Sequence, residues 1–186
     1  MSAPARLSGR ASATLTLAAV LMAACSTVAA PIDYRVGGAY PPNRTPSYPG
    51  GPFEGGPRFM SAPPSQCVPF ARGISGIDIR GDANTWWSQA EGQYARGRMP
   101  ALGSVLVIRT YGDNSRGHLA VVTRVVSNRE IWVDHANWHG RGEIAVQVPV
   151  RDVSGNNSWT EVNVWWLDTN RWGVKNYLVE GFIYPR

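Results

Sequence analysis

Six apolar segments follow one another closely after Pro100, and no other feature of the sequence constrains the fold as strongly. They are rich in Val, Ile, Leu and Trp, residues that favour β-strands, and they cover residues 104–110, 118–126, 130–137, 144–150, 161–167 and 178–184. Turn signals such as Ser127-Asn128 and Gly140-Arg141-Gly142 separate them. The second half of the chain is therefore predicted to form a sheet.

Two short helices are predicted ahead of these strands. The first runs from Cys67 to Ile74, with Pro69 tolerated in its first turn. Asp82 is expected to cap a second helix that continues to Ala90 and buries Trp86. Helices followed by a run of strands indicate an α+β fold with an antiparallel sheet of about six strands.

Residues 1–25 have the parts of an export signal: Arg6 and Arg10, a short apolar stretch over residues 15–24, and small residues after it. The apolar stretch is too short to predict a permanent transmembrane helix. The sequence LMAAC, which ends at Cys25, resembles a bacterial lipobox. This implies lipidation of Cys25 and a membrane anchor, on the periplasmic face of an outer membrane. Simple cleavage near Ala30 and free secretion is the alternative.

Residues 26–64 are predicted to be a linker, and the folded domain is predicted over residues 65–186. Nine of the fourteen prolines lie between residues 31 and 64, among paired glycines, and no hydrophobic period is visible there. Such a linker could extend to roughly 110 Å at about 3.3 Å per residue. A lipid-anchored domain on this tether could search a layer beside its membrane.

The composition favours a globular domain and argues against nucleic-acid binding. Hydrophobic residues make up 44% of the chain and eight residues are Trp, which suits a globular fold rather than a disordered chain. The formal net charge of +5 is modest, whereas nucleic-acid binding needs basic residues gathered on one face.

Cys67 is the one cysteine of the predicted domain, because Cys25 belongs to the leader. At a helix N-terminus, the helix dipole and exposed N–H groups stabilise a thiolate, so a lowered pKa is expected for Cys67. The predicted hairpin turns near Asn128, which brings His118 beside His135 and Asn137 on one face. A cysteine, a histidine and a polar group that orients the histidine are the parts of a thiol hydrolase.

Five motifs resemble those of the CHAP family, the cysteine- and histidine-dependent amidohydrolases/peptidases. They are QCVPFAR at 66–72, GDANTW at 81–86, PALGSV at 100–105, GHLAVV at 117–122 and HANW at 135–138. The resemblance spans about residues 65–140, in order and with family-like spacing. It implies a papain-like α+β fold and hydrolysis of amide bonds in peptidoglycan, with no metal or organic cofactor.

By position, the resemblance implies that Cys67 is the nucleophile and His118 the base. The third position often holds Glu in the family; here it is His135, and Asn137 follows two residues later as support. Gln66 is a candidate to help the backbone N–H of Cys67 bind an oxyanion.

Several alternatives remain open on sequence alone. The three histidines with Asp134 suggest a zinc site, which the lack of a helical spacing and of a second cysteine argues against. His139 is expected to face solvent in a turn. The tryptophans at 138, 159, 165, 166 and 172 could line a sugar-binding groove or simply fill a core. The domain could also be a non-catalytic wall-binding module, or an exported lysin aimed at other cells.

Overall fold

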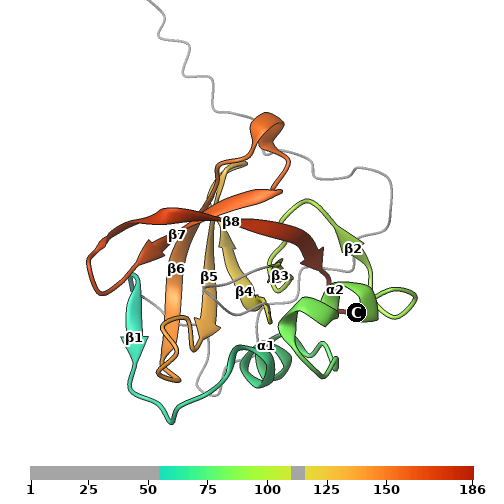
Figure 1. The fold of residues 1–186 in the computed structure, drawn as a ribbon, viewed down its shortest axis with the longest axis horizontal. Helices are drawn as coiled ribbons and strands as arrows, with labels where there is room; N and C mark the ends of the chain where they lie inside the picture. The colour runs from blue at the N-terminus through green and yellow to red at the C-terminus, as the bar shows by residue number, and fades with distance from the viewer. Residues whose placement is uncertain (1–54, 110–115) are drawn as a thin grey trace, which may run out of the picture. The chain divides into compact units, whose positions relative to one another are not determined.

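Antiparallel strands carry most of the chain in the computed structural model, which describes residues 55–109 and 116–186 (Figure 1). The strands are β1 (Arg58–Met60), β2 (Arg96–Gly97), β3 (Val105–Ile108), β4 (His118–Val125), β5 (Glu130–Ala136), β6 (Ile144–Asp152), β7 (Glu161–Trp166) and β8 (Arg171–Ile183). The predicted export signal, the lipidation site at Cys25 and most of the predicted linker lie outside the described residues.

Six of the strands close into a barrel. They follow the order β6, β5, β4, β3, β8 and β7, and β7 pairs with β6 to complete the ring. The short strands β1 and β2 add to the outside of this ring by pairing with β6 and β8. The predicted antiparallel sheet of about six strands is therefore confirmed, and its closure leaves few open strand edges.

Few helices accompany the barrel. They are α1 (Cys67–Ser75), α2 (Trp86–Gln89) and the 3-10 turns η1 (Ala83–Thr85) and η2 (Gly155–Asn157). Helix α1 ends at Gly76, whose φ of +73° suits a residue without Cβ. The second predicted helix is divided into η1 and α2; Asp82 precedes it without a side-chain capping bond, and Trp86 is fully buried. No helix within the described ranges is long and apolar enough to cross a membrane.

Strands β3 and β4 separate two apolar cores. Alternate residues of β4 point to opposite faces: Ala120 and Val122 face the barrel interior, whereas Leu119 and Val121 join the cluster of α1 and α2. Both faces of these strands are buried, which explains their nearly continuous apolar sequence. In Figure 1, α1 lies beside the ends of β4 and β5, which it contacts.

Two boundaries differ from the predictions. Strand β1 lies in the segment predicted as linker, and its residues pair with 144–146 of β6, so the sheet includes chain before residue 65. Strand β8 begins at Arg171 rather than at residue 178. Its first half mixes Gly, Lys and Asn with aromatic residues, so it lacks the apolar run that marks a strand. Pairing with β7, for example Trp165 with Trp172, extends it.

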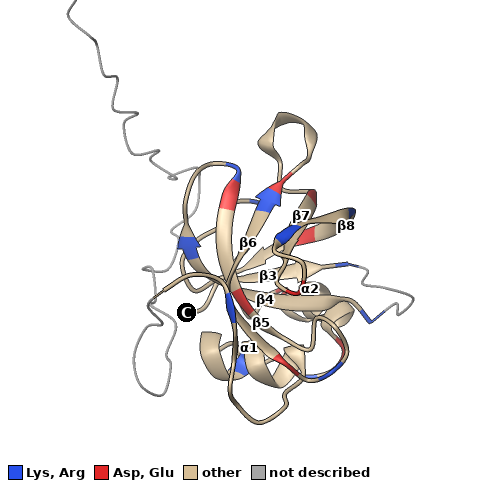
Figure 2. Cartoon of the chain, turned by 90° about the vertical axis from the view of Figure 1, so that its left-hand side faces the viewer, with Lys and Arg blue, Asp and Glu red and all other residues tan. Residues whose placement is uncertain are grey.

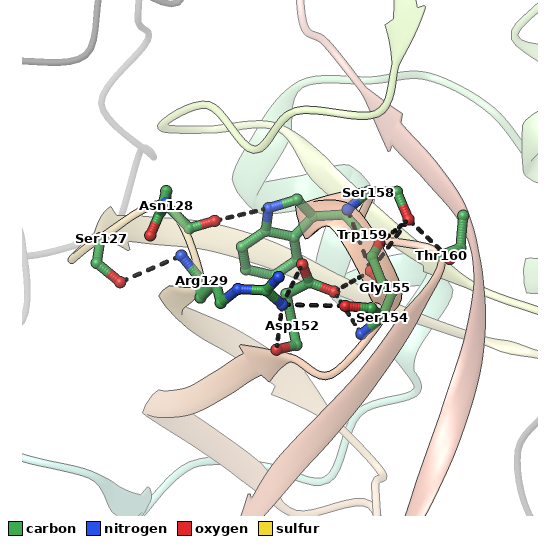
Figure 3. Close-up of polar contacts among 9 residues, drawn as sticks. All are labelled: Ser127, Asn128, Arg129, Asp152, Ser154, Gly155, Ser158, Trp159 and Thr160. Carbon is green, nitrogen blue, oxygen red and sulfur yellow. Dashed lines mark hydrogen bonds and ion pairs between the residues drawn. The ribbon is translucent and has the colours of Figure 1, made fainter.

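A polar network closes the end of β6 (Figure 3). The Asp152 carboxylate accepts hydrogen bonds from the Ser154 backbone N–H, at 2.9 Å, and from the Ser154 hydroxyl. Its other oxygen lies 3.3 Å from Arg129 Nη1. The indole N–H of the buried Trp159 donates to the Asn128 carbonyl at 3.1 Å. The network joins the β4–β5 turn to the β6–β7 connection.

Candidate active site

A groove of about 920 Å³ opens at the end of the barrel where β4 begins. Its lining includes Gln66, Cys67 and Val68 from the start of α1, Asp82 before η1, Gly117 and His118 at the start of β4, residues 137–140 after β5, Trp166 of β7, and Val174, Lys175 and Tyr177 of β8. Four of the five predicted site residues of the domain line this groove; His135 lies behind His118.

Cys67 is the first residue of α1, and its free thiol is half-buried. Burial raises the pKa of this thiol; hydrogen bonds with the backbone of Leu119, Val68 and Cys67 itself lower it, and the charge of Asp82 raises it. The net direction is upward, so the predicted lowering of the pKa is wrong. The reason is that burial outweighs the helix-terminal N–H groups. The bond with Leu119 puts the sulfur beside the start of β4.

The neighbouring Gly117 sets the position of His118. Its φ is +75°, and a Cβ there would lie 2.7 Å from the Ile108 carbonyl oxygen and 3.0 Å from the Asn84 backbone nitrogen. His118 follows with its side chain on the barrel side and is only 2% exposed. Its ring packs edge-on against Trp138, with 4.8 Å between ring centroids.

His118 and His135 form a buried imidazole pair. The Nε2 atom of His118 lies 3.1 Å from Nδ1 of His135, and the rings meet edge-to-face. Burial lowers the pKa of His118 well below its usual range, and His135 lowers it further. Burial, followed by the charge of His139, lowers the pKa of His135 to about 3. Both rings are therefore neutral near pH 7, and one donates a hydrogen to the other.

The sequence predicted that Asn137 and His135 share one face of a strand, and this prediction is wrong. Strand β5 ends at Ala136, and Asn137 has a φ of +61°. Its side chain instead joins two loops: Oδ1 accepts from the Gly142 backbone N–H at 2.7 Å, and Nδ2 donates to Gln66 Oε1 at 2.6 Å. Because a backbone N–H can only donate, this chain of bonds fixes both amide orientations and leaves Gln66 Nε2 as a donor.

The predicted exposure of His139 is wrong. Its side chain is only 9% exposed, and Nδ1 lies 2.8 Å from Asp168 Oδ2. The ring stacks on Trp166 with 4.6 Å between centroids, and Arg141 contacts both His139 and Asp168. These contacts form because the β7–β8 hairpin packs against the loop after β5. The local sequence around His139 does not predict this packing.

The charged side chains of the described residues are spread over the fold. Within residues 55–109 and 116–186, no group of three or more His, Cys, Asp or Glu side chains is arranged to hold a metal ion. Basic and acidic residues are interspersed over several strands in Figure 2 and do not gather on one element.

The fold and the groove define a sheet-rich protein in which a cysteine at the start of α1 and a buried histidine, itself bonded to a second histidine, line one groove at the end of a barrel. A family model described as CHAP domain matches residues 58–137, which confirms the resemblance to this family. CHAP domains are typically amidases or peptidases that act on peptidoglycan. A comparison with curated proteins returns no match. The matched segment ends at Asn137, before the groove wall formed by His139, β7 and β8.

Proposed function

We propose that this protein is an exported cysteine amidohydrolase or endopeptidase that hydrolyses amide bonds of peptidoglycan through an acyl-enzyme. The observation that carries the proposal is that Cys67 and His118 line one groove, with His135 bonded to His118, inside the segment that matches the CHAP family. The helix-borne cysteine beside a histidine-bearing sheet also supports a papain-like assignment of the fold.

In the first step, the Cys67 sulfur attacks the carbonyl carbon of the substrate amide. The thiol proton passes to Nδ1 of His118, because Nε2 is engaged by His135. A C–S bond forms, and the carbonyl π electrons move to oxygen. The Cys67 backbone N–H and Gln66 Nε2 are the donors proposed for this oxyanion, with Asn137 holding the Gln66 amide in orientation.

His135 fixes the tautomer of His118 in this proposal. For Nδ1 of His118 to accept the thiol proton, Nε2 must carry a hydrogen, and it then donates to His135 Nδ1 at 3.1 Å. The imidazolium formed during attack keeps this bond. His135 therefore does with a neutral ring nitrogen what a carboxylate does in many relatives of the family.

Collapse of the tetrahedral intermediate breaks the C–N bond, and protonated His118 gives its proton to the leaving amine. The acyl group remains on Cys67 as a thioester. His118 then takes a proton from water as the water oxygen attacks the thioester carbonyl, and the sulfur leaves with its electron pair and is reprotonated. No metal or organic cofactor takes part in this sequence.

The test is digestion of purified peptidoglycan by the wild type and by Cys67→Ala, followed by mass spectrometry of the released muropeptides. New amine and carboxyl termini are expected with the wild type and not with the variant, and they identify the bond that is cut. Cleavage that persists in Cys67→Ala contradicts the proposal. Binding of peptidoglycan without cleavage by the wild type supports the wall-binding alternative instead.

We also propose that Cys25 anchors the protein by lipidation to the periplasmic face of the outer membrane, with the chain between Cys25 and β1 as tether. The LMAAC sequence at the end of the apolar leader supports this. Cys25→Ser is expected to move the protein from the membrane fraction to the soluble or secreted fraction. An unchanged distribution between fractions contradicts anchoring.

A further inference from the structure

The groove wall opposite α1 carries a positive charge that the family match does not cover. Lys175 lines the groove from β8, together with Tyr177 on the same strand, beyond the matched segment that ends at residue 137. Its side chain is exposed. It is also the only lysine in the sequence, where all other fixed positive side chains are Arg.

The acidic residues nearest to this wall along the chain are engaged elsewhere. Asp168, in the β7–β8 turn, contacts His139 and Arg141, and Glu180 of β8 pairs with Arg109 at 2.7 Å. No ion pair involves Lys175 in the part of the chain that the structure describes. Its ammonium group is therefore available to a ligand in the groove.

The charges on the two sides of the groove differ. Asp82 and Arg116 line it on the Cys67 side, where Arg116 is held beside Asn84 by a backbone hydrogen bond of 2.7 Å, so this side carries both signs of charge. A carboxylate of a bound peptide meets Asp82 as well as Arg116 there, whereas on the β8 side it meets the positive charge of Lys175. The side chains of Trp166 and Tyr177 supply apolar surface near Lys175. A bound peptide would cover this surface and exclude water, which strengthens the attraction between its carboxylate and Lys175.

We propose that Lys175 binds a free carboxylate of the peptide substrate, so that the groove selects acidic stem peptides over their carboxamide forms. This rests on the proposed function and names its specificity. The carboxylate lies on the β8 side of the groove, away from Asp82. An exposed ion pair alone is weak, but a pair partly covered by bound peptide is expected to give about tenfold selectivity, equivalent to about 1.4 kcal/mol.

The experiment measures binding, so that it does not depend on turnover. Cys67→Ala protein is titrated against two fluorescent stem peptides of one sequence. One has free carboxylates on its D-glutamyl and diamino acid residues, and the other has both as carboxamides. Tighter binding of the carboxylate peptide by about tenfold is expected, and the preference should shrink as salt rises.

Lys175→Met, added to the Cys67→Ala protein, is expected to bring the two dissociation constants together, whereas Lys175→Arg keeps them apart. The matched control is Arg171→Met, which removes one positive charge from the same strand outside the groove and should keep the preference. Because the chain has one lysine, acetylation and reductive methylation test the same charge: acetylation should remove the preference and methylation should retain it.

Equal binding of the two peptides by the Cys67→Ala protein, or no binding of either, overturns the inference. So does a preference that survives Lys175→Met. Failure of the proposed function has a different signature, because a wild-type protein that prefers the carboxylate peptide in binding but cleaves neither peptide would retain the inference and lose the hydrolase.

Discussion

At the scale of single residues, burial keeps both Cys67 and His118 neutral, and the third residue adds to this effect at His118. A carboxylate beside His118 would stabilise an imidazolium, whereas the neutral His135 ring supplies a hydrogen bond and no charge. Burial and His135 both lower the pKa of His118, and burial raises the pKa of the Cys67 thiol. All these effects favour a neutral thiol and a neutral imidazole at rest, so in the proposed mechanism His118 takes up the proton only during attack.

This charge state predicts a broad pH profile for kcat/KM. In the proposed mechanism, the active form has a neutral His118 imidazole and a protonated Cys67 thiol. The acid limb follows the pKa of His118 and should lie below pH 6.5, and the alkaline limb follows the pKa of Cys67 and should lie above pH 9.0. Kinetics between pH 4 and 10 on a peptide substrate provide the measurement. A narrow optimum with an acid limb above pH 6.5 would contradict the neutral resting state.

Replacing the third residue should move the acid limb in a predictable direction. His135→Glu puts a carboxylate near Nε2 of His118, which stabilises the imidazolium and raises its pKa. The acid limb of kcat/KM is expected to move upward by about one to three pH units. His135→Gln is the control, because it offers a neutral acceptor and no charge. An equal upward movement in both variants would show that charge is not the cause.

At the scale of elements, the start of β4 connects the proposed catalytic side chains to the sheet. The turn at Gly117 passes so close to Ile108 and Asn84 that no side chain fits, and it delivers His118 to the end of the barrel. Helix α1 reaches the same point from the other core and places Cys67 against the backbone of Leu119. The site thus depends on the junction of two cores.

Gly117→Ala tests this junction. A positive φ and a Cβ 2.7 Å from a carbonyl oxygen should cost about 1–3 kcal/mol of stability and displace His118, with loss of most of the activity. The control is Gly73→Ala in α1, where a Cβ meets nothing within 4 Å and the helix gains about 0.5–1 kcal/mol. Thermal unfolding and peptide hydrolysis measure the two effects. Full activity in Gly117→Ala would show that the turn does not position His118.

The sequence predicted side-chain positions correctly where apolar and polar residues alternate regularly along a strand. It did not predict them where contacts between distant segments determine the position of a side chain. Strands β4 and β5 follow their predicted apolar runs closely, so the approach of His118 to His135 could be predicted. The positive φ of Asn137 takes it off the strand, and the hairpin of β7 and β8 covers His139. Both depend on contacts between segments distant in sequence, and burial likewise reverses the expected pKa direction of Cys67.

At the scale of the whole described domain, the two ends of the barrel have separate roles. His135 pairs with Ala145 near the start of β6, and Asp152 lies at the end of the same strand, roughly 23 Å away at about 3.3 Å per residue. The groove occupies the first end. The network around Asp152 and Arg129 joins two connections at the other end and covers the barrel core at Trp159 (Figure 3).

This separation predicts a variant that loses stability and keeps its chemistry. The Asp152 side chain is fully buried, so Asp152→Ala leaves the Ser154 N–H and hydroxyl without their acceptor. It also removes the ion pair of Arg129, which keeps only the backbone carbonyls of Asp152 and Ser154 as acceptors. Since Arg129 is 45% exposed and can turn to water, the expected loss is about 2–3 kcal/mol, or roughly 10 °C in Tm. Well below Tm, kcat/KM should match the wild type, because the groove residues keep their contacts.

The matched control is Asp78→Ala. The Asp78 side chain is 70% exposed, and its ion pairs with Arg72 and Arg80 are 3.9 and 3.5 Å long, so its loss should cost less than about 0.5 kcal/mol. Calorimetry and hydrolysis rates on the two variants give the comparison. Equal Tm values would show that the network contributes no stability. A fall in kcat/KM confined to Asp152→Ala would show that the two ends of the barrel are coupled. Strand β6 would then transmit strain along its length, so that a change at Asp152 moves His135, which pairs with the other end of this strand.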